Sequence, residues 1–415
     1  MTPAARISAS IEVLEQLEAA TRPADEIVSQ YFRSRRFIGS KDRRDISERV
    51  FAVEREQARL DWWAGNAGPR ARVIAHLALV EGATPSELFS GGKFGPEPLS
   101  AEEQGLADRL TGQTLDQPDM PMAARLELPE WLEPLFAETF GDRLEIEMAA
   151  LNRPAPLDLR VNTLKASRGE AQSRLAGEGI DSASTPISPF GLRVSGRVNL
   201  SASRTYQDGW VEVQDEASQI CAIKVDTKAD RLTIDLCAGA GGKTLALAAI
   251  MKDGGPLVAC DNDAGRLQRM EARLRRAGVS NVTRRRITGP DDAALDRYRG
   301  NAERVLVDAP CSGSGAWRRN PAARWLLTPE RLESHIAEQK ALLAKASALV
   351  APKGRLIYST CSVLKRENQD QADHFLEFHP DFRAVPASAE NAYLSLTPAR
   401  DGTDGFFVAV FEKVA

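Results

Sequence analysis

The sequence predicts an α/β protein in which a Rossmann-like sheet over residues 226–415 follows two other domains. We expect an all-helical domain over residues 1–125 and a small α+β domain over residues 126–225. Three observations predict this order: helical spacing of apolar residues in the first part, short β-like runs in the second, and strands that alternate with amphipathic helices in the third. A chain of 415 residues is long enough for two or three domains.

The first part of the chain, residues 4–110, has apolar residues at steps of three and four, without the alternation that is typical of strands. Examples are Ile11, Leu14, Leu17, Ile46, Val50 and Val53. The next stretch, residues 111–129, contains Gly112 and three prolines among short polar residues, which predicts a linker. The helical domain is therefore expected to end near this stretch.

The second part of the chain has shorter elements. The runs LDLRV and GLRV predict strands at residues 157–161 and 191–194, and the residues between them predict a helix over 168–178. Strands of this length around one helix are typical of a small α+β domain.

Beyond Arg231, apolar strands alternate with amphipathic helices, which predicts a parallel sheet with helices on both faces. The expected strands are residues 232–236, 257–260, 305–307 and 355–358, and the expected helices are residues 244–251, 264–277 and 330–349. Pro329 at the first position of the last helix and Pro352 beyond its end delimit it. The apolar run 405–411 is predicted to be the last strand.

Composition excludes several classes of protein. Hydrophobic residues make up 43% of the chain and charged residues 27%, which is typical of a globular protein and not of a disordered one. No run of about 18 uncharged apolar residues is present, and glutamates interrupt the N-terminal segment where a signal peptide needs an apolar stretch. We therefore expect a cytoplasmic protein that does not bind a membrane.

The charge is distributed unevenly, although 54 Lys and Arg nearly balance 58 Asp and Glu. Residues 31–72 hold eleven basic and six acidic residues, and residues 266–286 hold eight arginines and one glutamate. Local basic surfaces of this kind indicate contact with nucleic-acid phosphates, and solvated helix surface is the alternative for both.

The five cysteines are widely spaced and include no C-x-x-C pair, which argues against disulfides and against a zinc site. They are Cys221, Cys237, Cys260, Cys311 and Cys361. We expect no bound metal. The first three are expected to be structural residues or to contribute only their backbone.

A glycine-rich turn joins the first strand of the sheet to its first helix. Its sequence, DLCAGAGGKT over residues 235–244, lets a ligand approach the backbone at a helix N-terminus. The turn matches neither the dinucleotide fingerprint nor the P-loop. Asp261 follows the second strand, where a carboxylate commonly binds ribose hydroxyls. The pair predicts a nucleoside site, and a tight connection beside a surface aspartate is the alternative.

Four motifs in combination carry a specific resemblance: DLCAGAGGKT, VACDNDAGRL, VLVDAPCSGSG and RLIYSTCS. Together they resemble the S-adenosylmethionine-dependent RNA cytosine-5 methyltransferases of the Sun family. The resemblance covers residues 151–415 and includes LRVNTLK, VQDEASQ and DGFF. It implies a class I methyltransferase sheet, a preceding RNA-recognition domain and, more loosely, a NusB-like RNA-binding domain at the start. It also implies S-adenosylmethionine as cofactor and RNA as partner, with small-subunit ribosomal RNA favoured.

The resemblance also implies which residues hold the cofactor. They are Cys237, Ala238, Gly239, Ala240, Gly241, Gly242, Lys243, Asp261 and Asp308. Asp308 would border both the methionine moiety and the target base. Two positions depart from the family pattern. The family usually has proline where Ala240 stands, and the third strand lacks the acidic residue that contacts adenine. Asp291 or Asp292 would take that contact only if the loop is displaced.

The expected chemistry needs a nucleophile. Carbon 5 of cytosine is weakly nucleophilic, so a thiolate first adds at carbon 6. Cys311 and Cys361 each follow an expected strand, and the carboxyl ends of parallel strands meet at one edge of a sheet. The resemblance implies that Cys361 attacks and that Cys311 assists proton removal and product release, with Cys311 as attacker the alternative. Asp308 would hydrogen-bond nitrogen 3 and the amino group of the base.

A cytosine inside a helix hides both ring faces, so the RNA must be unpaired or the base flipped. The candidate RNA contacts are basic and polar residues near the sheet: Arg160, Asn162, Lys165, Arg266, Arg269, Arg273, Arg276, Arg318, Arg319 and Arg324. Trp317 and Trp325 are either stacking surfaces for a base or packed core residues.

Other functions fit parts of the sequence. A catalytically silent ribosome-assembly factor would use the same fold to bind RNA, and transfer RNA is the alternative substrate. A small-molecule methyltransferase would leave the basic surfaces without a role. Asp215 and Glu216 have no partner acid, so we expect them to be structural or to lie on the cofactor side, and the resemblance puts Asp404 near the site. We expect a monomer.

Overall fold

The computed structural model describes residues 1–19, 24–65, 68–289 and 292–414. By its internal contacts the chain forms two compact units. The first contains Met1–Arg153 and Trp317–Thr328, and the second contains Pro154–Ala316 and Pro329–Ala415. The segment Trp317–Thr328 therefore belongs to the first unit, although its neighbours in sequence on both sides belong to the second. The domain boundaries near residues 125 and 225 stay a prediction.

The first unit is helical, as the spacing of its apolar residues predicts. Its helices are α1 (Pro3–Glu18), α2 (Ala24–Ser34), α3 (Ser40–Arg55), α4 (Gln57–Ala64), α5 (Gly68–Leu79), α6 (Pro85–Leu88), α7 (Ala101–Leu110), α8 (Met122–Arg125), α9 (Glu133–Phe140), α10 (Leu144–Leu151) and α16 (Ala323–Leu326). Leu14, Ile46 and Val50 lie in their shared core and are almost fully buried. The helical prediction is confirmed.

The segment that follows Ala316 is packed inside the first unit. Trp317 is 1% exposed, and its ring stacks on Phe136 with the centroids 5.4 Å apart. Arg324 is fully buried and donates hydrogen bonds to the main-chain oxygen of Glu127 and to Oδ1 of Asn152. Of the two alternatives for Trp317, packing in the core is therefore the one that holds. The prediction that Arg324 contacts RNA is wrong, because its side chain is buried and hydrogen-bonded inside the first unit.

The second unit begins with a small antiparallel sheet of strand order β2-β3-β1-β4. Its strands are β1 (Leu157–Val161), β2 (Ser182–Ser184), β3 (Gly191–Val194) and β4 (Val211–Val213), and its helices are α11 (Arg168–Gly177) and α12 (Arg204–Gln207). α11 begins where the sequence predicts because Ser167 and Glu170 form a capping box. Leu159 and Leu192 lie in the core between the sheet and α11. The predicted α+β domain is confirmed.

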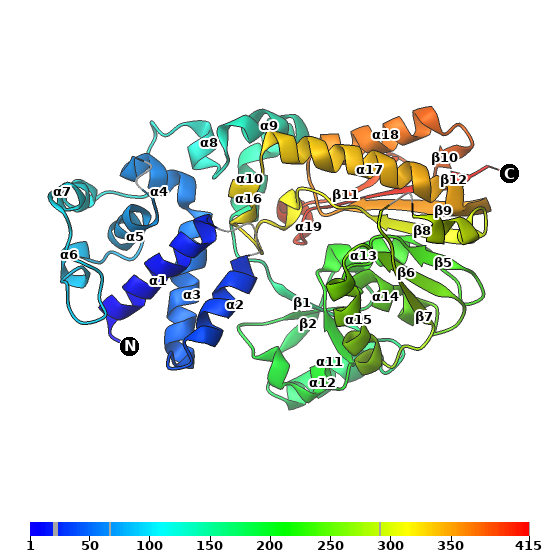
Figure 1. Ribbon diagram of the computed structural model, residues 1–415, viewed down its shortest axis with the longest axis horizontal. Helices are drawn as coiled ribbons and strands as arrows, with labels where there is room; N and C mark the ends of the chain where they lie inside the picture. Colours follow the sequence, from blue (N-terminus) through cyan, green and yellow to red (C-terminus); the bar gives the residue numbers. More distant parts are fainter. Residues whose placement is uncertain (20–23, 66–67, 290–291, 415) are drawn as a thin grey trace. The chain divides into compact units, whose positions relative to one another are not determined.

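The large sheet has the strand order β10-β12-β9-β8-β5-β6-β7, with β11 beside β12. Its strands are β5 (Thr233–Asp235), β6 (Leu257–Asp261), β7 (Val282–Arg286), β8 (Ala302–Asp308), β9 (Val350–Thr360), β10 (Phe382–Ala384), β11 (Leu394–Leu396) and β12 (Phe406–Lys413). β5 to β9 are parallel, and β12 runs antiparallel to β9 (Figure 1). This is the predicted Rossmann-like sheet.

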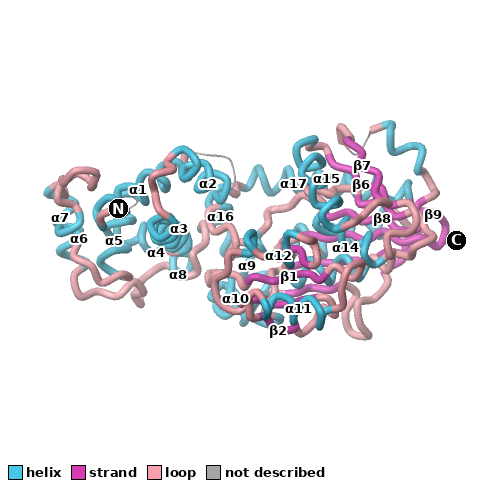
Figure 2. The backbone as a smooth tube through the Cα atoms, turned by 90° about the horizontal axis from the view of Figure 1, so that it is seen from below, coloured by secondary structure: helices cyan, strands magenta, loops and turns pink. Residues whose placement is uncertain are grey.

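Helices cover both faces of this sheet (Figures 1 and 2). They are α13 (Glu216–Lys224), α14 (Gly242–Ile250), α15 (Ala264–Ala277), α17 (Pro329–Leu349) and α18 (Gln369–Phe378). α17 and α18 lie on one face and the other three lie on the opposite face (Figure 1). A short helix, α19 (Pro398–Asp401), precedes the last strand. Among the residues that the structure describes, no helix is long and apolar enough to cross a membrane.

The start of β9 differs from the prediction. The strand begins at Val350, directly after α17, and not near residue 355. Pro352 has no N–H to donate, and Lys353 has a φ of 61°. The pairing of β9 with β8 accordingly shifts register between Ala302 and Arg304. The proline therefore marks an irregularity within the strand as well as the end of the helix.

β5 and β8 are neighbours in the sheet, although β6 and β7 lie between them in sequence. From β5 the chain continues to β6 and β7 on one side, and it then returns to form β8 on the other side of β5. The order of the strands therefore reverses between β5 and β8. In an open α/β sheet, ligands bind beyond the carboxyl ends of the strands at such a switch point. The loops after β5, β6, β8 and β9 therefore form the expected position of the site.

Candidate active site

The loop between β5 and α14 is shaped by two glycines. Gly239 and Gly241 have φ values of 55° and 85°, in the left-handed region that side chains rarely adopt. A Cβ added at Gly239 would meet nothing within 4 Å, whereas one at Gly241 would lie 2.5 Å from Met270 of α15. Gly239 thus leaves open space beside the backbone for a ligand, and Gly241 lets the loop pack closely on α15.

Hydrogen bonds from neighbouring elements anchor the same loop. The amide of Ala238 donates to the carbonyl oxygen of Cys260 at 2.8 Å, which joins the loop to β6. Arg273 of α15 donates to the carbonyl oxygen of Ala240 at 2.8 Å. This bond fixes the loop at Ala240, where the resemblance to the Sun family leads one to expect a proline. Arg160 of β1 donates to the carbonyl oxygen of Gly242 at 2.8 Å.

Asp261 lies at the end of β6 and is 5% exposed. Its Oδ2 accepts a hydrogen bond from the amide of Gly239 at 2.7 Å, and its Oδ1 accepts one from the amide of Asp263 at 2.8 Å. Each carboxylate oxygen has two lone-pair directions, so one on each oxygen stays available to a hydroxyl donor. The opening at Gly239 and this carboxylate therefore fit the ribose of S-adenosylmethionine.

The third strand, β7, ends at Arg286 and offers no carboxylate of its own for adenine. Asp291 lies outside the described residues. Asp292 uses both oxygens locally: they accept hydrogen bonds from the amide and hydroxyl of Thr288 and from the amide of Ala294. The structure therefore places Asp292 in a turn, and the adenine contact has no assigned residue.

Lys243 and Asp308 form an ion pair across the site. Nζ of Lys243 lies 2.7 Å from Oδ2 of Asp308, and the hydroxyl of Ser359 donates to Oδ1 at 3.1 Å. The lysine side chain is 10% exposed and the aspartate side chain 29% exposed. Burial disfavours the ammonium, but the Asp308 carboxylate outweighs it and raises the pKa of Lys243. Lys243 therefore stays charged and holds the Asp308 carboxylate in place at the end of β8.

Sequence reasoning missed Asp235, which is fully buried at the end of β5. Its Oδ2 accepts a hydrogen bond from the hydroxyl of Thr244 in α14 at 2.7 Å, so it ties the start of that helix to the strand. Burial raises its pKa to about 7. The available signal was a carboxylate inside the apolar run LTIDL.

We expect Asp235→Asn to become more stable relative to the wild type as the pH rises. An unfolded aspartate loses its proton near pH 4, whereas folded Asp235 keeps it until about pH 7. The wild type therefore loses stability between these values, by about 1.4 kcal/mol per pH unit, and an uncharged asparagine does not. Chemical unfolding should show the difference change by about 2.5 kcal/mol from pH 5 to pH 8.

Asp230→Asn is the control for this prediction, because Asp230 lies on an exposed loop and loses the same charge. Its stability difference from the wild type should change little over the same range. A difference for Asp235→Asn that stays constant from pH 5 to pH 8 would contradict the raised pKa.

The two candidate cysteines lie side by side. Cys311 follows β8 and Cys361 follows β9, which pair in parallel with Asp308 opposite Ser359. The two Sγ atoms are 3.6 Å apart, and both side chains are half-buried. The hydrogen bond with Cys361, burial and the negative charge of Glu367 raise the pKa of the Cys311 thiol well above its usual value. The Cys311 thiol therefore stays protonated at neutral pH.

The other cysteines lie in the fold around the sheet. Cys221 and Cys260 are fully buried, and burial raises the pKa of each thiol to about 12. Cys237 is half-buried in the glycine-rich loop, and burial raises its pKa well above the usual value. All three sulfur atoms therefore stay protonated at neutral pH.

The acidic residues at the start of α13, Asp215 and Glu216, are structural. Asp215 accepts a hydrogen bond from the amide of Ala217 and so caps the helix, and it also accepts from the amide of Asp404. Oε1 of Glu216 accepts hydrogen bonds from the amides of Ile187 and Ser188. These contacts fix the loop before β12 and the small sheet against α13.

Arg160, Asn162 and Lys165 have internal hydrogen-bond partners, and the burial of Arg160 and Asn162 corrects their prediction as RNA contacts. Arg160 is 4% exposed and holds the glycine-rich loop. Asn162 donates to the carbonyl oxygens of Gly209 and Ala277, and Nζ of Lys165 donates to two carbonyl oxygens, one of them at the end of α15. These side chains fasten the small sheet to the large one, because the ends of β1 and α15 meet there.

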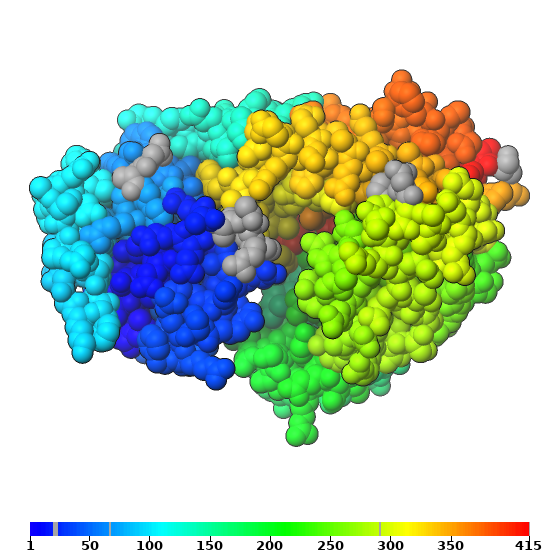
Figure 3. Space-filling model, in the orientation of Figure 1, coloured from blue at the N-terminus to red at the C-terminus, as the bar shows by residue number. Residues whose placement is uncertain are grey.

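The arginines of α15 divide into two groups. Arg273 and Arg276 form ion pairs with Glu212 of β4, so their guanidinium groups have partners within the unit. Arg266 and Arg269 are exposed. Figure 3 shows the α15 and β7 region at the surface of the molecule in yellow-green. The candidate phosphate surface on this unit is therefore reduced to the exposed arginines of α15 and β7.

A basic surface also lies where α2 meets α3 in the first unit. Arg36, Lys41 and Arg44 are exposed there, and Phe37 between them is 78% exposed. In the same unit the indole nitrogen of Trp325 donates to the carbonyl oxygen of Glu54, which anchors that side chain. Phe37 is thus an exposed aromatic residue within this basic surface, and sequence reasoning did not single it out.

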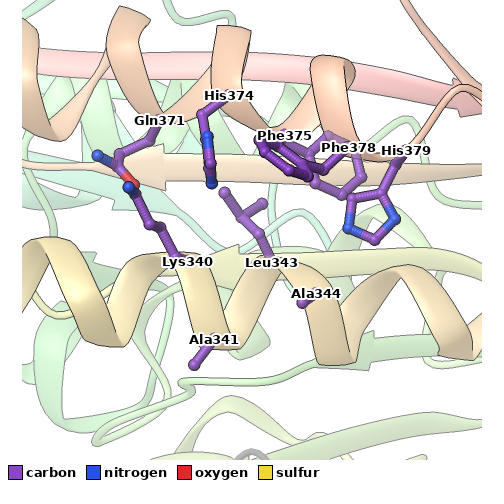
Figure 4. A pocket seen from close by; sticks show the side chains of 9 residues that line it. All are labelled: Lys340, Ala341, Leu343, Ala344, Gln371, His374, Phe375, Phe378 and His379. Carbon is purple, nitrogen blue, oxygen red and sulfur yellow. The ribbon is translucent and has the colours of Figure 1, made fainter.

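A groove of about 300 Å³ lies between α17 and α18, away from the predicted site residues. Figure 4 shows side chains of the two helices pointing toward each other across it. It is lined by Lys340, Ala341, Leu343, Ala344, Gln371, His374, Phe375, Phe378 and His379. None of these residues belongs to the loops that follow β5, β6, β8 and β9.

Comparison with known proteins places the chain in a family. Residues 222–412 match the model of the 16S rRNA methyltransferases RsmB/F, and residues 128–201 match the ferredoxin-like domain of the RsmF/B-like methyltransferases. The chain is 30% identical to the probable ribosomal RNA small subunit methyltransferase B of Synechocystis sp., over 91% of this chain and 92% of that protein. The chain belongs to the RsmB/F family of rRNA methyltransferases.

Solved structures agree with this family. The crystal structure of PH0851 matches 100% of this chain and 99% of its own, with a TM-score of 0.82 and 27% identity. A methyltransferase homologue from Pyrococcus horikoshii matches 70% of this chain and 97% of its own, with a TM-score of 0.62 and 26% identity. As an RsmB/F family methyltransferase, the chain uses S-adenosylmethionine, so the predicted family, fold and cofactor are confirmed.

Proposed function

We propose that this chain methylates carbon 5 of a cytosine in small-subunit ribosomal RNA through a covalent cysteine adduct. The observation that carries the proposal is the pair of sulfur atoms 3.6 Å apart, at the ends of two adjacent parallel strands. The Asp308 carboxylate ends one of these strands and is held by Lys243. Two thiols beside a carboxylate suit a reaction in which one group attacks a nucleobase and another accepts or donates a proton.

In this proposal Cys361 attacks as a thiolate. Its sulfur forms a bond to carbon 6 of the cytosine, and the electrons of the 5,6 double bond become available at carbon 5. S-adenosylmethionine supplies an electrophilic methyl group. After methylation carbon 5 carries both a hydrogen and a methyl group. Loss of that proton to a base reforms the double bond, and the Cys361 thiolate leaves carbon 6.

Cys311 is proposed to assist the second half of the reaction. Its raised pKa keeps it protonated, and its sulfur lies 3.6 Å from that of Cys361, which suits a group that assists the reaction beside the attacking sulfur. Asp308 is proposed to hydrogen-bond the amino group and a protonated nitrogen 3 of the base. Such a contact stabilises the proton on nitrogen 3, and the positive charge that this proton gives the ring favours attack at carbon 6.

The cofactor is proposed to lie along the glycine-rich loop, with Asp261 on its ribose and Gly239 beside it. The seven loop residues Cys237–Lys243 and Asp308 would then surround it. Gly241 keeps the loop against α15, and Asp261 retains acceptor capacity for hydroxyl groups. The glycine-rich loop and the two cysteines lie beyond the carboxyl ends of the same parallel strands, so a cofactor held by the loop would be on the cysteines' side of the sheet.

Ribosomal RNA as substrate is supported by the family and by charge. Relatives over most of this chain are named ribosomal RNA small subunit methyltransferase B, from Synechocystis and from Klebsiella pneumoniae. Exposed basic residues lie around Phe37 and on α15 and β7, where they suit a phosphate backbone and a stacked base.

The test incubates the purified chain with tritiated S-adenosylmethionine and, in parallel, small-subunit ribosomal RNA or transfer RNA. Bisulfite sequencing then maps 5-methylcytosine. We expect label in ribosomal RNA at one or a few cytosines. Label confined to transfer RNA would show that transfer RNA, and not ribosomal RNA, is the substrate. Binding of RNA and cofactor without methyl transfer would indicate an assembly factor and overturn the catalytic proposal.

A further inference from the structure

We propose that Glu367 is a positioning residue that sets the separation of the two cysteine-bearing loops, because its carboxylate accepts hydrogen bonds from both. This inference rests on the proposed function, in which Cys311 and Cys361 act on one base. Glu367 ends a short 3-10 turn, η6 (Lys365–Glu367), that follows the Cys361 loop. Its side chain is fully buried, which is rare for a glutamate unless it is well paired.

The carboxylate holds the loop after β8 on both sides of Cys311. The amide of Ser312, the next residue, donates to Oε1 of Glu367 at 2.8 Å, and its hydroxyl donates to Oε2 at 2.5 Å. Nε2 of Gln339 in α17 donates to Oε1 of Glu367 at 3.1 Å and to the carbonyl oxygen of Pro310 at 2.9 Å. The peptide that carries Cys311 is thus fixed at its preceding and following residues.

The same carboxylate holds the loop after β9. The hydroxyl of Ser362, directly after Cys361, donates to Oε2 of Glu367 at 2.5 Å. The Ser362 oxygen also accepts a hydrogen bond from the amide of Leu364 at 3.0 Å and lies 2.9 Å from the hydroxyl of Ser314. Because Ser314 belongs to the other loop, the serine hydroxyls and Glu367 form one buried network between the two cysteines.

Glu367 accepts four hydrogen bonds, two on each oxygen, from the residues next to both cysteines and from α17. Reacting groups must be held to within about 0.5 Å of the productive geometry, and a displacement of about 1 Å lowers a rate by about a hundredfold. A change at Glu367 should therefore act on the two sulfur atoms. It should leave the glycine-rich loop, which β6 and α15 anchor, unchanged.

The test compares Glu367→Gln and Glu367→Asp with Glu333→Gln in the full chain. Glutamine keeps the length but replaces one acceptor oxygen with a donor, so the two serine hydroxyls must reverse. Aspartate keeps the charge but is one methylene too short to reach both loops. Glu333 is the matched control, because it is an exposed glutamate that pairs with Arg366, the neighbour of Glu367.

The first readout is the rate at which diamide, a thiol oxidant, forms the Cys311–Cys361 disulfide, followed by mass spectrometry of the linked peptides. The second is kcat and KM for RNA methylation, with cofactor binding and a thermal transition measured alongside. We expect both Glu367 variants to form the disulfide at least about fivefold more slowly and to lose about tenfold or more in kcat. KM, cofactor affinity and the Glu333→Gln values should stay within twofold of the wild type.

Wild-type disulfide rates in both folded Glu367 variants would overturn the inference, whatever their kcat. Loss of the thermal transition in both variants would also overturn it, because Glu367 would then be needed for folding. The disulfide readout uses neither RNA nor cofactor. It therefore tests the position of the loops even if the wild-type chain fails to methylate cytosine, and the two proposals can fail separately.

Discussion

Cys361→Ala is expected to lower methyl transfer to ribosomal RNA by at least about a thousandfold, because the variant cannot form the bond to carbon 6. Without that bond carbon 5 does not become nucleophilic. Binding of S-adenosylmethionine should stay within about twofold of the wild type, because the glycine-rich loop and Asp261 are untouched. Tritium transfer and calorimetric titration measure the two quantities.

Cys311→Ala should lower methyl transfer at a later step of the reaction. If Cys311 assists the release of the product, the variant completes the attack by Cys361 and then stalls as a protein–RNA adduct. Denaturing electrophoresis with labelled RNA detects this adduct as a band of reduced mobility. Cys221→Ala is the control, because Cys221 is a buried cysteine outside the two loops. An adduct in Cys361→Ala and none in Cys311→Ala would reverse the two roles.

The fold was predictable because its elements carry local signals. The amphipathic pattern of residues 264–277 predicts α15 at its observed bounds, and the runs LDLRV and GLRV predict β1 and β3. The approach of Cys311 to Cys361 was also predictable, although 50 residues separate them, because each follows a strand of one parallel sheet.

The RNA contacts were predicted less well, because the sequence does not show whether a basic side chain binds RNA or a group within the protein. Arg160 and Lys165 bind carbonyl oxygens in distant elements, and Arg324 is buried in the first unit. Glu367 was missed for the same reason, because the polar run KRENQDQ around it gives no sign of burial. Pairings between residues far apart in the chain decide these cases, and only the assembled fold shows them.

Asp308→Ala is expected to be destabilising as well as inactive, because it leaves the Lys243 ammonium buried without its carboxylate. Lys243 is 10% exposed, so the remaining charge is poorly hydrated, and removing one partner of a buried pair costs about 3 kcal/mol. Lys243→Met should cost less, about 1 kcal/mol, because Asp308 is 29% exposed and keeps its bond from Ser359.

The double variant Asp308→Ala, Lys243→Met measures the free energy of the ion pair apart from the other contacts of its two side chains. A methionine in place of the lysine removes the buried charge, so the double variant should be more stable than Asp308→Ala alone, by about 1–2 kcal/mol. Urea unfolding of the four proteins measures this coupling. If the two single effects simply add, the ion pair does not hold Asp308 in place. A clear coupling would instead tie the orientation of Asp308, and hence its proposed contact with the base, to the lysine of the glycine-rich loop.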